Sequence, residues 1–384
     1  MSAEPMAVDA VQVPLGHSRD VSGLARLVAD GRLRPDEVVA VTGKTEGCTP
    51  GETSRVDADQ AIRGFLSEHG SRPDDQIAQL PMVFTSGGMG ILTPQLVVYS
   101  RRPAEPAADG GPRLALGTAR TARMQPEWTG TSRVIEETAA AVRAAAAEAG
   151  IAPETAEYVI GKAYHVPRRA LAAARAEGRA IPEYDDHTLF RRTSGSAALG
   201  IGTAVEGLPV LDGDEVGVRM DVWAGRASVS ANEWEGAAGG PDTQLILLGN
   251  RAGAGGRLRV GHAVVADMLD VDALPRALRR AGMDVGTGPL TPEQRARVIA
   301  VYVKIGPPPD GLLRGRRQVV ENPAYGTEVK AAVAGMFAGW LQDNLIWISG
   351  SATHQGPAGG GTLAAVVDVE DQRSGTSRPA GDGR

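Results

Sequence analysis

The sequence predicts an α/β protein made of three copies of one unit. One kind of segment occurs three times, at Leu33–Gly47, Ile151–His165 and Leu290–Gly306. In each, a proline with acidic neighbours is followed by an apolar run and then by a lysine. A stretch rich in helix-favouring alanine, leucine and arginine precedes each copy and ends at a glycine. Each copy is followed by a strand-like run, a serine, a small residue, a loop and an apolar strand. Such repetition indicates the architecture of the whole chain.

The three expected units follow one another along the chain. The first covers residues 1–105, the second residues 112–250 and the third residues 256–369. Segments rich in glycine and proline separate them, as is usual for linkers. Residues 370–384 carry few apolar side chains, and we expect them to form a disordered tail.

Each unit carries one lysine and one serine at corresponding positions. The lysines are Lys44, Lys162 and Lys304, and the serines are Ser86, Ser230 and Ser349. A lysine at the end of a buried strand is costly unless its amino group is used. Any one pair taken alone is best interpreted as ordinary loop residues. The threefold recurrence favours a shared site.

Serine and lysine together can act as a nucleophile and its base. A serine hydroxyl attacks a carbonyl only when a neighbouring base takes its proton. A lysine amine can be that base if burial or nearby positive charge lowers its pKa from about 10.4. The residue after each serine (Gly87, Ala231 and Gly350) is small, so its backbone N–H could bind an oxyanion. Three such corners suit a flat ring with three carbonyl groups.

The composition argues against several other classes of protein. The net charge is −6, only 4% of the residues are aromatic and no basic run with aromatics occurs, so nucleic acid is not an expected partner. No apolar run approaches the roughly 20 residues of a membrane helix, and no signal-like segment opens the sequence. Cys48 is the only cysteine, which excludes disulfide frameworks and cysteine zinc sites. We expect a cytoplasmic protein with no membrane partner.

Several motifs resemble those of the ring-opening amidohydrolases, the cyanuric acid hydrolases and barbiturases. They are the Gly-Lys pairs at Lys44 and Lys162, the three Ser-small pairs, "RTSGSAALGIG" at residues 192–202 and "HQGPAGGG" at residues 354–361. The resemblance implies three homologous units around a pseudo-threefold axis, with a central β-barrel and helices outside. It also implies a homotetramer, a small planar ring as substrate and no required cofactor.

The resemblance assigns roles to individual residues. It makes Ser230 the nucleophile, Lys162 its base and the Ala231 N–H an oxyanion donor. Two further serines with the N–H groups that follow them would hold the other ring carbonyls: Ser86 with Gly87, and Ser349 with Gly350. Lys44 and Lys304 would tune those serines. Arg55 and Arg192 match the family's first two ring-binding arginines, with Arg191 a rival for the second.

The chain departs from the family pattern at three places. Ala231 stands where the family has a glycine, which restricts the backbone there. Ile305 stands where the family has a metal-binding glutamate, so we expect any structural ion to be weakly held. Its candidate ligands are the backbone carbonyls of Ala352, Gln355, Gly356, Pro357 and Gly360. The third arginine is missing, and either Lys330 or Glu328 takes its place. We favour Lys330 pointing inward, because a glutamate would repel an anionic ring.

Three functions compete at this point. The first is a hydrolase that opens cyanuric acid to carboxybiuret, with barbituric acid, opened to ureidomalonate, as the next substrate. The second is a binding protein that keeps the pocket and has lost turnover, since Ala231 and the missing arginine could reflect decay. The third, a purely structural repeat protein, leaves the three aligned lysines unexplained.

Overall fold

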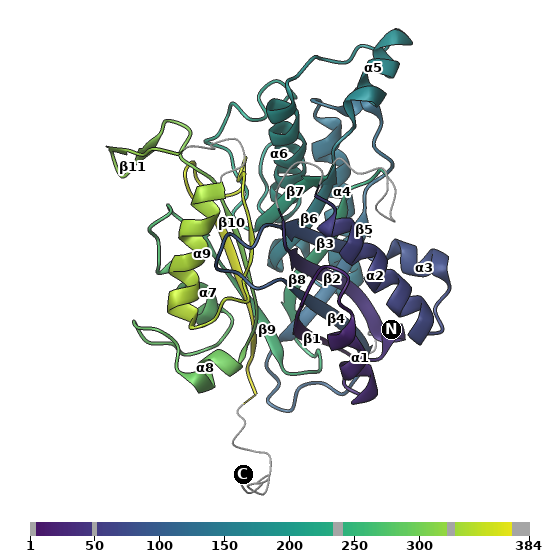
Figure 1. Cartoon of the computed structure of the whole chain (residues 1–384), viewed down its shortest axis with the longest axis vertical. Helices are drawn as coiled ribbons and strands as arrows, with labels where there is room; N and C mark the ends of the chain where they lie inside the picture. The colour runs from purple at the N-terminus through teal and green to yellow at the C-terminus, as the bar shows by residue number, and fades with distance from the viewer. Residues whose placement is uncertain (1–4, 48–51, 233–240, 321–326, 371–384) are drawn as a thin grey trace, which may run out of the picture.

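Three four-stranded sheets form the interior of the molecule, with helices outside them (Figure 1). The structure is a computed structural model that describes residues 5–47, 52–232, 241–320 and 327–370. The predicted tail therefore lies outside the described residues, apart from Glu370. No helix within the described ranges is long and apolar enough to cross a membrane.

The first sheet is drawn from residues 6–103. The elements of this part of the chain are, in order, β1 (Met6–Pro14), α1 (Ser22–Ala29), the 3-10 helix η1 (Pro35–Glu37), β2 (Val38–Thr45), α2 (Ser54–His69), α3 (Asp74–Gln79), β3 (Met82–Ser86) and β4 (Gln95–Pro103).

The second sheet is drawn from residues 113–251. Its part of the chain forms β5 (Arg113–Arg120), η2 (Pro126–Trp128), α4 (Arg133–Ala149), η3 (Pro153–Thr155), β6 (Ala156–Tyr164), α5 (Arg168–Ala176), α6 (Asp186–Val205), β7 (Ala227–Asn232) and β8 (Gln244–Arg251).

The third sheet is drawn from residues 258–368. Its part of the chain forms β9 (Leu258–Val265), α7 (Ala273–Arg280), α8 (Pro292–Ala296), β10 (Val298–Ile305), the short hairpin strands β11 (Leu312–Leu313) and β12 (Arg316–Arg317), α9 (Thr327–Leu341), β13 (Trp347–Ser349) and β14 (Gly361–Asp368).

The three sheets have the same strand order. They run β1-β4-β2-β3, β5-β8-β6-β7 and β9-β14-β10-β13. In each sheet the first two pairings are antiparallel, and the last pairing, which includes the lysine strand, is parallel. The sequence repeat is thus a repeat of topology.

Local sequence explains why corresponding elements recur. A proline opens the short helix before each lysine strand, where its missing N–H costs nothing. In the third unit a capping box between Thr291 and Gln294 reinforces that start. The alanine-rich α4 ends at Gly150, whose φ of 68° suits glycine and closes the helix.

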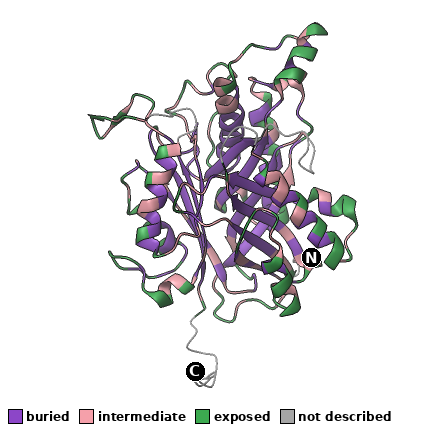
Figure 2. Ribbon diagram, in the orientation of Figure 1, coloured by how far each residue is buried: buried purple, intermediate pink, exposed green. Residues whose placement is uncertain are grey.

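One hydrophobic core lies between the three sheets, and further cores lie between the sheets and the helices. Burial is concentrated on the central strands, while the outer ends of the helices are exposed (Figure 2). The core between the sheets takes side chains from all three, including the fully buried Tyr99, Tyr158 and Tyr302. The hydroxyl groups of these tyrosines form hydrogen bonds with other buried hydroxyl groups. Tyr302 OH lies 2.6 Å from Tyr99 OH and 2.8 Å from Thr42 Oγ1, and Tyr158 OH lies 2.9 Å from Thr362 Oγ1.

The expectation of a closed central β-barrel is not met, because none of the sheets among the described residues closes on itself. Side chains rather than neighbouring strands satisfy outward-facing backbone groups of the edge strands. The Met82 N–H of β3 donates to Gln244 Oε1 at 3.0 Å, and the Val229 N–H of β7 donates to Gln355 Oε1 at 2.6 Å. The three sheets therefore pack around a common core as separate sheets.

Candidate active site

The strand register brings two of the three expected lysine–serine pairs together. In β6 and β7, Lys162 lies opposite Ser230, and in β10 and β13, Lys304 lies opposite Ser349. Lys162 Nζ is 3.2 Å from Ser230 Oγ, and Lys304 Nζ is 3.1 Å from Ser349 Oγ. Neighbouring residues of a parallel pair point to the same face, so the register itself sets these contacts.

Each lysine also reaches across to the next unit, which creates a closed cycle. Lys162 donates to Phe84 O at 3.1 Å, Lys304 donates to Val229 O at 2.7 Å, and Lys44 donates to Ile348 O at 3.0 Å. The second unit thus contacts the first, the third contacts the second and the first contacts the third. The three amino groups converge on one threefold centre, although their residues are far apart in sequence.

All three lysines are buried, and burial lowers the pKa of Lys162 and of Lys304. Their exposed fractions are 0% for Lys44, 7% for Lys162 and 1% for Lys304. Burial, followed by the positive charges of Arg55 and Lys304, holds the pKa of Lys162 well below its usual value. Burial and the nearby charge of Lys330 lower the pKa of Lys304 to about 7. An amine with a pKa of about 7, such as that of Lys304, loses its proton near neutral pH and can then accept one from a hydroxyl.

The first unit differs from the other two. The residue opposite Lys44 is Thr85, and Ser86 lies opposite Thr45. Lys44 Nζ contacts the backbone carbonyl of Ser86 at 2.7 Å. The glycine before Lys44 makes room for this strand, since a side chain on Gly43 would collide with the Phe84 ring.

The backbone donors expected at the three corners are also arranged unequally. The Gly87 N–H donates to Thr45 O at 3.0 Å, so it belongs to the β2–β3 pairing and does not face the site. Gly87 has a φ of 90°, a conformation that favours glycine, and this turns the chain out of β3. Ala231 and Gly350 directly follow the paired serines, as expected.

Two of the three expected positive side chains lie near the lysines. The charge of Arg55, on α2, acts on Lys162. On α9, Lys330 is 8% exposed and its charge acts on Lys304, whereas Glu328 is exposed. This is the orientation that the sequence favoured.

Arg192, the third expected positive side chain, contacts Tyr184 and the loop after α6. Its guanidinium donates to Tyr184 OH at 3.2 Å, to Gly213 O and to Asp214 O at 3.2 Å, and it stacks over the Tyr184 ring at 4.6 Å. These contacts hold the loop after α6. The neighbouring Arg191 instead donates to Thr353 Oγ1 at 3.3 Å, close to the loop that follows Ser349. Arg191, the rival for the second family arginine, therefore lies against the loop that follows Ser349.

The loop after Ser349 is held rigidly by two buried side chains. His354 is fully buried; its Nε2 accepts the Gly217 N–H at 2.7 Å and its Nδ1 donates to Val222 O at 2.7 Å. This arrangement requires a neutral ring, and burial lowers the pKa of His354 accordingly. Gln355 holds the N–H of Val229, the residue before Ser230. Ser351 and His354 adopt left-handed φ angles of 58° and 56°, so this tightly held loop also stores strain.

The same loop offers a divalent ion backbone carbonyls but no carboxylate at position 305. Ile305, where the family has a carboxylate, is fully buried in the hydrophobic core of the third unit. Three of the five candidate carbonyls accept bonds within the loop or from its neighbour: Ala352 O from Gln355, Pro357 O from Gly360, and Gly360 O from Gly306. The residues that the structure describes contain no group of three or more His, Cys, Asp or Glu side chains that could hold a metal. No step of the chemistry is assigned to an ion.

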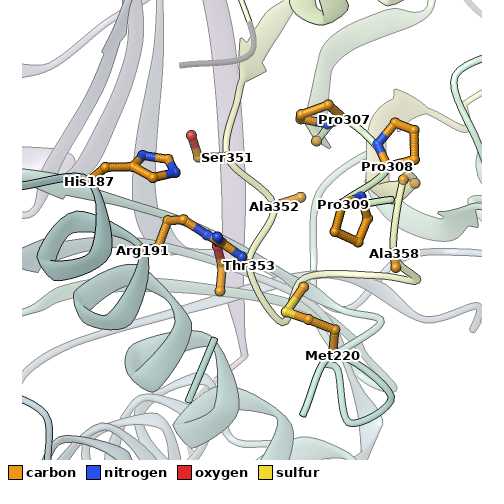
Figure 3. A pocket seen from close by; sticks show the side chains of 13 residues that line it. His187, Arg191, Met220, Pro307, Pro308, Pro309, Ser351, Ala352, Thr353 and Ala358 are labelled. Carbon is orange, nitrogen blue, oxygen red and sulfur yellow. The ribbon is translucent and has the colours of Figure 1, made fainter. Parts of the chain in front are cut away.

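A cavity of about 200 Å³ opens where β10 and β13 end (Figure 3). Its lining begins two residues beyond Lys304 and Ser349, at Gly306 and Ser351, and includes His187 and Arg191 from α6. Neither member of a lysine–serine pair lines it. We therefore regard the cavity as a space next to the third corner, and we base the site on the contacts of the lysines.

Sequence reasoning missed Thr85, the buried side chain of Gln355 and the anchoring role of His354. Met82, Val83 and Phe84 are all apolar, so the sequence does not show which face of the strand Thr85 occupies. The glycine-rich segment around Gln355 predicts a role for its backbone carbonyl and none for its side chain. Its long-range contact depends on how the units pack, which local sequence does not report.

Comparison with known proteins agrees with this geometry. A family model described as an amidohydrolase ring-opening protein matches residues 9–368. The chain is 32% identical over 375 residues to Barbiturase 1 of Nocardioides sp., covering 95% of this chain and 100% of that protein. It is 33% identical over 367 residues to a cyanuric acid amidohydrolase of Bradyrhizobium diazoefficiens, covering 92% and 95%.

Solved structures show the same fold. One of a cyanuric acid hydrolase matches with a TM-score of 0.85 at 29% identity, covering 95% of this chain and 100% of that one. That of cyanuric acid hydrolase from A. caulinodans matches with a TM-score of 0.82, also at 29% identity and with the same coverage. Together with the length of the family match, these likenesses show that the chain belongs to the ring-opening amidohydrolase family.

Proposed function

We propose that this chain hydrolyses a cyclic imide, with cyanuric acid as the leading substrate, and that Ser230 and Lys162 perform the reaction. The observation that carries the proposal is the 3.2 Å contact between Ser230 Oγ and the buried Lys162 Nζ, whose pKa is well below its usual value. A neutral amine at this distance can take the hydroxyl proton and make the serine a nucleophile.

The reaction follows from the placement of these groups. Ser230 Oγ attacks a ring carbonyl while its proton passes to Lys162. The Ala231 N–H donates to the oxyanion and stabilises the negative charge that develops there in a buried site. The ring C–N bond then breaks, the departing nitrogen takes the proton from Lys162, and an acyl-enzyme forms with the opened ring still attached. Water releases the linear acid and restores the serine.

Positive charge around the centre suits an anionic ring. Arg55 acts near Lys162, and Lys330 acts near Lys304. Ser349, 3.1 Å from Lys304, can donate to a second ring carbonyl. Because a cyclic imide loses a proton readily, charge as well as shape favours such a ring over a neutral amide.

Barbituric acid is the second candidate substrate. The chain resembles a barbiturase and a cyanuric acid amidohydrolase about equally, at 32% and 33% identity. Both rings carry three carbonyl groups, so the threefold centre does not distinguish them.

Loss of ring ultraviolet absorbance tests the proposal. We expect the wild-type protein to open at least one of the two rings, and Ser230→Ala and Lys162→Met to abolish turnover while the circular dichroism spectrum is unchanged. More than roughly a tenth of wild-type activity in either variant would contradict these roles, because removing a nucleophile or its base costs orders of magnitude. Tight binding of a ring without turnover in the wild type would instead support a decayed binding protein.

A further inference from the structure

We infer that Thr85, and not Ser86, supplies the side-chain hydroxyl of the first corner, and that the Ser86 N–H is the backbone donor beside it. The inference rests on the proposed function for its role in substrate binding. Its structural basis is the equivalence of the three sheets, and four observations support it.

The first observation is the strand register. Lys162 faces Ser230 and Lys304 faces Ser349, but Lys44 faces Thr85. Ser86 is one position further along and faces Thr45. Shifting a strand by one residue moves a side chain to the other face of the sheet.

The second observation is the division of side chains between the cores. Val83 lies in the core between the three sheets, whereas Met82 and Phe84 lie in the outer core against α2. Strand alternation therefore places Thr85 on the central face and Ser86 on the outer face. Thr85 is 7% exposed, the same fraction as Ser230, while Ser86 is half-buried.

The third observation is the cycle of lysine contacts. Lys304 contacts the carbonyl of Val229, which precedes Ser230, and Lys44 contacts the carbonyl of Ile348, which precedes Ser349. Lys162 contacts the carbonyl of Phe84. The residue that follows Phe84 is Thr85. Its Oγ1 lies 3.5 Å from Ile348 O, the carbonyl that Lys44 also contacts.

The fourth observation is the direction of the backbone N–H groups. In a parallel pair these groups alternate between the neighbouring strand and the open side. The Gly87 N–H points to the neighbouring strand, because it donates to Thr45 O, whereas the Met82 N–H leaves the sheet for Gln244. Ser86 shares the parity of Met82, so its N–H faces the open side.

The second unit shows the same alternation in the expected place. The Val229 N–H leaves its sheet for Gln355, and Ala231 shares its parity. Ser86 thus corresponds to Ala231 and to Gly350, the residues that follow the paired serines. The conspicuous Ser-Gly-Gly motif at residues 86–88 is displaced by one position from the functional corner.

A threonine gives this corner a distinct chemistry. Its hydroxyl can donate to a ring carbonyl as a serine would, and its methyl group adds apolar volume and limits rotation about χ1. Lys44 donates to two backbone carbonyls, those of Ile348 and Ser86, so these contacts hold the corner in place. We therefore assign Thr85 to positioning the ring and to selecting which ring fits, with no covalent role.

Kinetics of three variants test the inference on whichever ring the wild type opens. Thr85→Val removes only the hydroxyl and is expected to raise KM roughly five- to 150-fold, because an unsatisfied polar partner costs about 1–3 kcal/mol. Thr85→Ser restores the hydroxyl and is expected to recover most of that loss. Ser86→Ala keeps the backbone N–H, and its KM is expected to rise clearly less than that of Thr85→Val. Thr118→Val is the control for replacing a strand threonine by valine, since the Thr118 hydroxyl contacts Glu148.

Opposite results are equally clear. A larger effect of Ser86→Ala than of Thr85→Val, or failure of Thr85→Ser to recover the KM of the wild type, would overturn the inference. If the wild type opens neither ring, the proposed function fails separately. A crystal structure then decides the inference without any substrate: Lys44 opposite Thr85 supports it, and Lys44 opposite Ser86 overturns it.

Discussion

Lysine is rarely buried, yet three lysines of this chain end inside the molecule with at most 7% of their surface exposed. Each donates to a carbonyl of the neighbouring unit, which compensates the loss of water. Two of them also face a serine hydroxyl, so the same burial that costs stability prepares a base. The pKa of Lys162 and that of Lys304 are lowered by burial before any neighbouring charge.

The pH dependence of catalysis follows from the lowered pKa of the base. Lys162 must be neutral to accept a proton, so kcat/KM is expected to fall as pH decreases through its folded-state pKa, well below the usual lysine value. Arg55→Met removes a charge that lowers this pKa and should move the acidic limb to higher pH. The ionisation of the ring is the same for both proteins, so a difference in the limb reports on the enzyme. Arg316→Gln, on an exposed strand, is the control. If Arg55→Met left the acidic limb of the kcat/KM profile at the same pH, the assignment of Lys162 as base would be contradicted.

Lys330 and Glu328 are expected to contribute unequally to binding of the ring. Lys330→Ala should raise KM roughly tenfold or more, since a hydrogen bond to a charged group contributes about 1.5–3 kcal/mol. Glu328→Ala should change KM little, because that side chain is exposed. Steady-state kinetics with both variants measure this difference. A large gain of activity in Glu328→Ala would show that the carboxylate faces the ring.

At the scale of elements, side chains of the loop between β13 and β14 join the second and third units. His354 holds the loop after α6, and Gln355 holds the strand that carries Ser230. Both contacts cross between units, so the loop of the third unit positions the strand of the second that carries Ser230, the proposed nucleophile.

This loop is expected to hold no stoichiometric divalent ion. Ile305 is buried in the core, and carbonyls that could bind an ion accept hydrogen bonds already. Elemental analysis of protein purified without chelator should therefore find well under one divalent ion per chain, and added Ca²⁺ or Mg²⁺ should not shift the melting temperature. One tightly held ion per chain would show that the ligands lie elsewhere.

The sequence predicted the elements better than it predicted their pairing. The prolines before the lysine strands, the alanine-rich α4 and the strands on either side of each serine have clear local causes, and all are present. The offset of Thr85 and Ser86 was missed because the Ser-Gly pair is the more conspicuous motif, while the register depends on which face each residue buries. The sequence does not separate Arg191 from Arg192 for a similar reason: neighbours on a helix face different ways, and only packing shows which of them reaches the loop after Ser349.

At the scale of the whole molecule, the site exists only where the three sheets meet. The cycle of lysine contacts joins each unit to the next, and the central core takes side chains from all of them. No single unit contains a complete corner, because each lysine depends on a carbonyl from another unit. Because the sheets are separate, backbone N–H groups of the edge strands can donate to side chains. In a closed barrel, neighbouring strands would pair these groups.

Burying Lys304 is expected to lower stability at neutral pH. Its pKa is about 7 in the folded protein and near 10.4 in the unfolded chain, so between these values the unfolded state binds more protons. The free energy of unfolding therefore rises with pH across this window, by about 1.4 kcal/mol per pH unit for this group. Lys304→Met removes this dependence. Urea unfolding at several pH values between 7 and 10 should show the variant more stable at pH 7 and the advantage shrinking as pH rises. An advantage that stays constant with pH would contradict the lowered pKa.

Intact-mass measurement after rapid acid quench tests the central claim, that Ser230 is acylated by an opened ring. Opening a ring expels no fragment, so the acyl-enzyme should be heavier than the free protein by the full mass of the substrate. We expect this adduct in the wild type during turnover, on the peptide that contains Ser230, and its absence in both Ser230→Ala and Lys162→Met. An adduct on the peptide of Ser349, or turnover by Ser230→Ala, would contradict the assignment.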